Sequence, residues 1–128
     1  MAANHSDGFI GLLASRDWSS EEGRARLELD VTPQHLNPAG TVHGGVLASL
    51  MDMAMGQAVR SSTGEGDVPA TSQLTVTYLR PASPDAGSLV VTAAVSKQGD
   101  DLTVCEADVE QEGRSLAHAL ATFAVLHK

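Results

Sequence analysis

One aspartate lies alone in an apolar stretch, eight positions after the first of two adjacent glycines. The stretch from Gly44 to Arg60 repeats apolar residues at helical spacing, and Asp52 is its only acidic residue. A carboxylate in such surroundings is a candidate general base that removes a proton from water. The same pattern also fits an aspartate that faces solvent on a partly exposed helix.

The step His43-Gly44-Gly45 comes directly before this helical pattern. The first N–H groups of a helix have no partner within it, so they can hold a carbonyl oxygen or an oxyanion. Gly44 and Gly45 are therefore candidates to polarise a substrate carbonyl, or they form a tight turn with no ligand. His43 is a candidate donor to a leaving group, or a local cap. Asn37 either holds a carbonyl or water, or only shapes the Asn-Pro turn.

Gly44 and Asp52 are too far apart to act on one carbonyl within one chain. Eight helical residues rise about 12 Å along the axis, and the lean of side chains toward the N-terminus recovers only part of this. Either the two groups are unrelated, or a two-fold dimer with antiparallel helices brings Gly44 of one chain toward Asp52 of the other. An enzyme built in this way is inactive as a monomer.

The stretches around the helix alternate polar and apolar residues with period two, which is typical of strands. The predicted strands cover residues 24–31, 69–80, 88–96, 102–110 and 114–126. Short turns join the last four strands, which implies antiparallel neighbours. Residues 1–20 are predicted to be an N-terminal extension with a short helical turn. We expect a single domain over residues 1–128, of α+β class, with one sheet wrapped around one long helix.

Composition restricts the function classes further. The net charge of −8 opposes nucleic-acid binding, which relies on basic side chains. The single cysteine, Cys105, excludes an internal disulfide, fits the cytoplasm and is expected to be buried. No apolar run approaches membrane-spanning length, so no membrane association is expected. The chain also has no zinc pattern, GxGxxG or Walker loop, or GxSxG elbow, and we expect no metal and no cofactor.

The string NPAGTVHGG at residues 37–45, followed by Asp52, resembles the hotdog-fold acyl-CoA thioesterases. The nearest branches are the PaaI-type group and the Arthrobacter-type 4-hydroxybenzoyl-CoA thioesterases. The segment TSQLTVTYLRP at residues 71–81 is similar to the strand that follows the helix in that family. The resemblance implies an antiparallel sheet of five to six strands around a central helix. It also implies a homodimer at minimum, usually a homotetramer, with sites at the dimer interface.

The resemblance implies a role for each matching residue. Asp52 matches the general base or nucleophile, and Gly44 matches the backbone N–H that polarises the thioester carbonyl. Asn37 matches the amide that places carbonyl and water, and His43 matches the residue near the departing thiol. Thr71 lies where relatives position the attacking water with a hydroxyl.

Gly45, Arg80 and Pro81 are the implied substrate contacts, with Arg80 beside the coenzyme A phosphates. The expected reaction is hydrolysis of an aryl- or medium-chain acyl-CoA to free acid and CoA, where CoA is part of the substrate and no cofactor is needed. Two alternatives stay open: a non-catalytic acyl-CoA-binding hotdog protein, and a hotdog enoyl-CoA hydratase or dehydratase.

Overall fold

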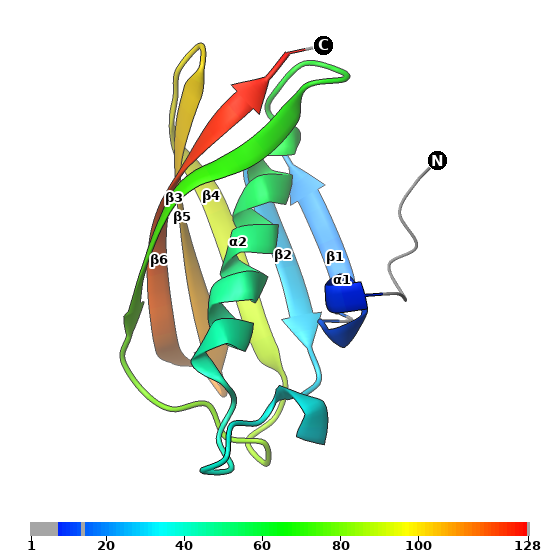
Figure 1. The fold of residues 1–128 in the computed structure, drawn as a ribbon, viewed down its shortest axis with the longest axis vertical. Helices are drawn as coiled ribbons and strands as arrows, with labels where there is room; N and C mark the ends of the chain where they lie inside the picture. The colour runs from blue at the N-terminus through cyan, green and yellow to red at the C-terminus, as the bar shows by residue number, and fades with distance from the viewer. Residues whose placement is uncertain (1–7, 14, 128) are drawn as a thin grey trace.

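The computed structural model describes residues 8–13 and 15–127. It contains one antiparallel sheet of order β1-β2-β4-β5-β6-β3, and the long helix α2 (Gly44–Arg60) lies across one face of it (Figure 1). The strands are β1 (Arg16–Glu21), β2 (Arg24–Leu29), β3 (Val68–Tyr78), β4 (Leu89–Gln98), β5 (Leu102–Gln111) and β6 (Arg114–Leu126). Two short helices, α1 (Gly8–Leu12) and η1 (Pro33–His35), precede α2.

The α+β class and the sheet wrapped around a single long helix are confirmed. Helix α2 follows β2 near one edge of the sheet, and the chain then enters β3 at the opposite edge. The five strands predicted from alternation all form, with ends that differ by two residues or fewer from the expected ones. None of the helices in the described part of the chain is long and apolar enough to cross a membrane.

The N-terminal region differs from the prediction, because residues 16–20 belong to the sheet and not to an extension. They form most of β1, which pairs antiparallel with β2 at the sheet edge. Its sequence RDWSSE contains one apolar residue, Trp18, so it carries no period-two signal. Instead, Arg16 donates to Glu28 at 2.6 Å and to Asp30 at 2.9 Å. The same arginine lowers the pKa of Asp30 through its hydrogen bond.

The core lies between α2 and the inner face of the sheet. The buried stripe of α2 consists of Leu47, Leu50, Met51, Ala54, Met55, Ala58 and Val59. Facing it are small buried residues of β5 and β6, among them Ala107, Ala119 and Ala121, which let the helix lie close to the strands. Cys105 is fully buried as predicted, and this burial raises the pKa of its thiol to about 12. Such a thiol is unreactive in the folded protein.

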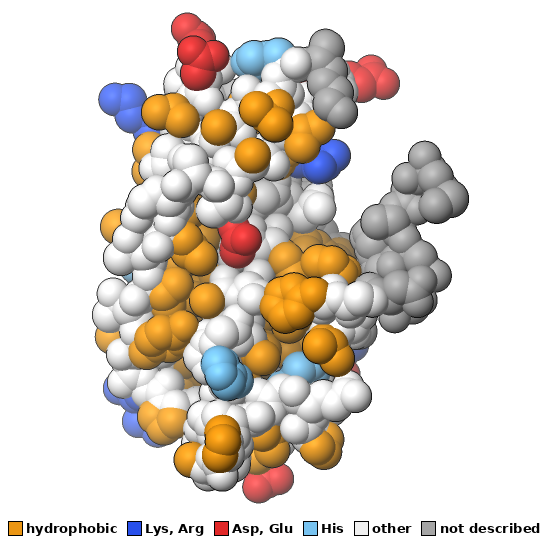
Figure 2. Space-filling view, viewed as in Figure 1, with side chains coloured by type: hydrophobic (Ala, Val, Ile, Leu, Met, Phe, Trp, Pro, Cys, Tyr) orange, Lys and Arg blue, Asp and Glu red, His pale blue; other side chains and the backbone are white. Residues whose placement is uncertain are grey.

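The outward face of α2 is less covered than its composition predicts. Ala48, Asp52, Met53 and Gly56 are half-buried there, although most of the helix is apolar on all sides. Figure 2 shows hydrophobic side chains exposed on this side of the molecule. The side of the protein that carries Asp52 therefore has apolar surface available to a ligand or a second subunit.

Candidate active site

The start of α2 is capped by His43. Its ring Nδ1 accepts a hydrogen bond from the Gly45 N–H at 2.8 Å, so the cap alternative for His43 describes this structure. Val46 N–H in turn donates to the His43 carbonyl at 2.9 Å. No group within residues 8–13 and 15–127 accepts from the Gly44 N–H. The N–H groups of Gly44 and Gly45 were both proposed to bind a substrate oxygen. The Gly45 N–H is used by the His43 cap, and the Gly44 N–H stays available.

Close packing against Tyr78 favours a glycine at position 44. The Tyr78 hydroxyl donates to the Gly44 carbonyl at 2.7 Å. A Cβ on Gly44 would lie 3.2 Å from the Tyr78 ring and hydroxyl, which is tighter than ordinary contact. The end of β3 is thereby fixed against the start of α2.

Asn37 holds the turn that leads into α2. Its Oδ1 accepts from the N–H groups of Ala39 at 2.9 Å and Thr41 at 3.2 Å, and its Nδ2 donates to Thr41 Oγ1 at 2.9 Å. These are the bonds of an Asx turn, the second of the two roles considered for this side chain. Asn37 therefore sets the path of the backbone toward Gly44.

Sequence reasoning missed His35, which fastens this loop to the body of the protein. The ring is buried, its Nδ1 accepts from the Thr32 N–H at 2.9 Å, and its Nε2 donates to the carbonyl of Leu12, the last residue of α1. Its own carbonyl accepts from the His43 N–H at 2.8 Å. A histidine after Thr-Pro in a polar stretch carries no periodic signal, because its partners lie on distant segments.

Replacement of His35 by alanine is expected to lower the free energy of unfolding by about 3 kcal/mol, since two buried backbone groups lose their partners. Urea unfolding followed by circular dichroism measures this. Asparagine can keep the acceptor for Thr32, and glutamine can keep the donor to Leu12. Each of these two variants should lower the free energy of unfolding by less than alanine does. Equal stability of all three variants would contradict the role of the His35 hydrogen bonds.

Asp52 lies at the middle of the outward face of α2 and is bound by Thr71. The Thr71 hydroxyl donates to Asp52 Oδ1 at 2.7 Å. Simple alternation would put Thr71 on the face opposite to Leu74 and Tyr78. A bulge between Thr71 and Gln73 adds one residue to β3, so Thr71 turns to the helix side. The contact between Thr71 and Asp52 thus depends on an irregularity in the strand.

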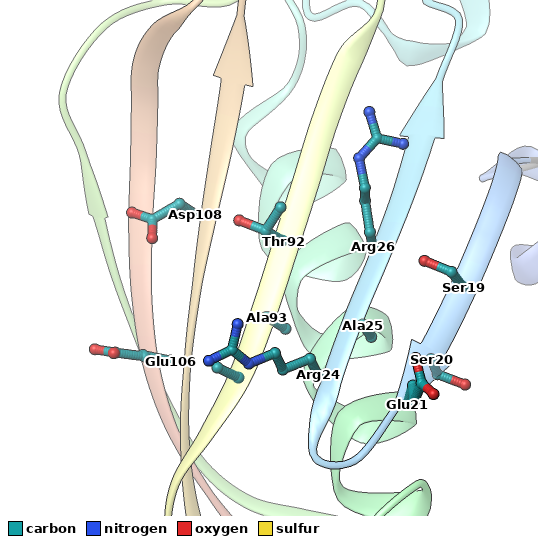
Figure 3. A pocket seen from close by; sticks show the side chains of 11 residues that line it. Ser19, Ser20, Glu21, Arg24, Ala25, Arg26, Thr92, Ala93, Glu106 and Asp108 are labelled. Atoms are coloured by element: carbon teal, nitrogen blue, oxygen red, sulfur yellow. The ribbon is translucent and has the colours of Figure 1, made fainter.

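A pocket of about 920 Å³ opens beside this pair. Asp52 and Thr71 lie in its lining together with Phe123 of β6. On the other side it is walled by residues around α1 and in β1, including Ile10 and Trp18. A second hollow of about 590 Å³ lies on the face of the sheet away from α2, where Arg24 and Glu106 are among its charged residues (Figure 3). Only the first hollow contains the candidate base.

The structure brings the predicted residues together in two groups and not in one. Asp52 and Thr71 form the first, and Gly44 with its loop forms the second, about 12 Å away along α2. Arg80 and Pro81 are exposed beyond the end of β3, and the Val42 N–H donates to the carbonyl of the adjacent Ala82 at 3.0 Å. They therefore belong to the second group.

The chemistry open to these groups is acid–base and oxyanion chemistry. Across the described ranges, no cluster of three or more histidine, cysteine, aspartate or glutamate side chains can hold a metal ion. In the second group, Arg80 is a cation, and its guanidinium donates to the Ser115 carbonyl at 3.0 Å. A base beside an apolar pocket and a free helix-start amide are the two parts needed for attack of water on a carbonyl.

Known proteins share both the sequence and the fold. The profile of the thioesterase superfamily matches residues 39–118. Human acyl-coenzyme A thioesterase 13 is 33% identical over 71% of this chain and 64% of its own length. A conserved protein of Pseudomonas aeruginosa has a TM-score of 0.87 and 32% identity, covering 98% of this chain and 96% of that one. A Bacillus halodurans protein solved with CoA has a TM-score of 0.75 and 33% identity, covering 79% of this chain and 66% of that one.

Proposed function

The chain belongs to the thioesterase superfamily, with the hotdog fold, and we propose that it hydrolyses the thioester of an aryl- or medium-chain acyl-CoA. The observation that carries this proposal is the Asp52 carboxylate, held by Thr71 at 2.7 Å beside an apolar pocket. The relatives named acyl-coenzyme A thioesterase support the reaction, and the neighbour solved with CoA supports the ligand.

In the proposed reaction, water attacks the thioester carbon and Asp52 takes its proton. The negative charge that develops on the carbonyl oxygen is held by the Gly44 N–H and the positive end of α2. The C–S bond then breaks, and CoA leaves as a thiolate that takes up a proton from solvent to become the thiol. Asp52 gives its own proton back to solvent, which restores the base. Asp52 acts as base in this scheme, and the reaction needs no metal or cofactor.

The other predicted residues take supporting roles in this proposal. Asn37 sets the turn before Gly44, and His43 lies at the helix start near the departing sulfur. Gly45, Arg80 and Pro81 border the path of coenzyme A, with Arg80 as the cation for its phosphates.

The free edge of β3 supports a shared site. In the described sheet β3 pairs only with β6, and its other edge carries eleven residues with exposed Leu74 and Tyr78. A long, apolar edge of this kind invites a second strand. We propose that two copies of β3 pair antiparallel across a two-fold axis, as in a homodimer. The homotetramer and the cytoplasmic location expected from the sequence are separate parts of this proposal.

The register of this pairing decides which groups meet. Thr71 is bonded to Asp52, and Tyr78 is bonded to Gly44. With the bulged Ser72 left unpaired, a pairing centred on Thr75 puts Thr71 opposite the partner's Tyr78. Asp52 then approaches the partner's Gly44, which removes the distance that separates the two groups within one chain.

Replacement of Leu74 by glutamate is expected to give a monomer without thioesterase activity. The residue lies one position from the proposed two-fold axis, so the two introduced carboxylates would lie diagonally across the axis on the same face of the paired strands and repel. Analytical ultracentrifugation and a thiol-release assay measure the two effects. Leu102→Glu adds the same charge at an exposed residue of β5 and serves as the control. A dimeric, active Leu74→Glu protein would contradict the pairing.

A panel of acyl-CoA esters in a thiol-release assay tests the proposed function itself. Buried Cys105 adds no background, because its thiol does not react in the folded protein. Release of CoA from aryl or medium-chain esters is the expected result. Binding without release would favour the non-catalytic alternative, and hydration of an enoyl-CoA would favour the hydratase.

A further inference from the structure

We infer that Gly56 sets the size of the acyl chamber, and that the acyl group accepted there is apolar and larger than acetyl. This inference rests on the proposed function and assigns a specificity-determining residue to the same site. Gly56 follows Asp52 by one helical turn on the same face of α2, where side chains four positions apart are about 5–6 Å from each other. Gly56 and Asp52 both line the 920 Å³ pocket, so the open space over Gly56 adjoins the place proposed for the thioester carbon.

Neither backbone geometry nor packing requires a glycine at position 56. The residue lies inside α2 and does not have a positive φ. Outside α2 itself, a Cβ there would meet only Phe123 Cε2 among the described residues, at 3.7 Å, which is ordinary contact. At Gly44, in contrast, a Cβ would lie 3.2 Å from the Tyr78 ring, which must move slightly to admit it. Because glycine weakens a helix interior, its presence at position 56 points to a use for the open space.

The lining of the pocket indicates what fills that space. Its apolar members come from several elements and are Ile10, Leu13, Trp18, Met53, Pro69 and Phe123. Among the described residues of the lining, the only charged side chains are Asp52 and Arg60, and Arg60 lies two turns beyond Asp52 at the exposed end of α2. Next to Gly56, an acyl group therefore meets an aromatic ring and a flexible thioether, which suit an apolar group.

The test compares phenylacetyl-CoA, octanoyl-CoA and acetyl-CoA as substrates of wild type, Gly56→Ala and Gly56→Leu. One added carbon in an apolar pocket changes kcat/KM by a factor of about ten or more. We therefore expect Gly56→Ala to lose about tenfold and Gly56→Leu at least about 100-fold with the two larger esters, mainly through KM, with little change for acetyl-CoA. Gly56→Ala should also raise the melting temperature by about 3 °C. Thr92→Leu, on the face away from α2 (Figure 3), should keep the wild-type preference.

The outcomes separate this inference from the function on which it rests. If wild type releases no thiol from any of the three esters, the proposed function fails. If wild type is active and the ratio of kcat/KM for the large esters to that for acetyl-CoA stays the same in Gly56→Ala, the inference that Gly56 sets the size of the chamber is overturned. Should Gly56→Leu not fold, the alanine variant decides alone, because its Cβ fits at 3.7 Å from Phe123.

Discussion

Replacement of Asp52 by asparagine is expected to lower kcat by about 1000-fold while the protein keeps its fold. Asparagine has almost the same shape, and its side-chain oxygen can still accept the hydrogen bond that Thr71 donates at 2.7 Å. It cannot take a proton from water. Steady-state thiol release gives the rate, and thermal unfolding shows that the structure is intact.

Thr71→Val is the matched control for this variant. It removes the hydrogen bond to Asp52 and keeps the carboxylate, so we expect a loss of about tenfold, the value of one hydrogen bond to a charged group. Turnover near that of wild type in Asp52→Asn would remove Asp52 from the mechanism. Equal losses in the two variants would assign the effect to geometry and not to proton transfer.

The elements that carry regular patterns could be predicted from the sequence. The apolar period of α2 gave both its bounds and the place of Asp52 on it, and helical rise alone separated Asp52 from Gly44. Strands β2, β4, β5 and β6 were predicted because one face of each carries buried residues that alternate with less buried ones. In these segments the local sequence reports burial directly.

The parts that were missed depend on contacts between distant segments. Strand β1 has a single apolar residue, Trp18, and is held by Arg16, so no alternation marks it. The bulge after Thr71 reverses the faces of β3, and only the register with β6 reveals it. His35 is bonded to Leu12 across 23 positions of sequence. A pattern within one element cannot indicate partners that the tertiary fold supplies.

Replacement of Gly44 by proline is expected to lower kcat by about 100- to 1000-fold, because it removes the N–H proposed to hold the oxyanion. Proline is favoured at the first position of a helix, where its ring adds no clash with a preceding turn. His43 has φ −58° and ψ 133°, an extended conformation that is allowed before proline. Gly44→Ala brings the same Cβ to Tyr78 but keeps the N–H, so its smaller loss measures the steric part alone.

Mixing Asp52→Asn with Gly44→Pro tests whether two chains share each site. Each variant alone has two defective sites per dimer. In a mixed dimer one site receives both defects, while the other combines the intact Asp52 of one chain with the intact Gly44 of its partner. After subunit exchange half of the dimers are mixed, so the activity should recover to about a quarter of wild type. A mixture of Asp52→Asn with Asp52→Ala has no intact site in any dimer and must stay inactive. If the first mixture also stays inactive after exchange, the two chains do not share a site. Because the length of helix between Asp52 and Gly44 keeps them from meeting at one carbonyl within one chain, this result would contradict the proposed mechanism.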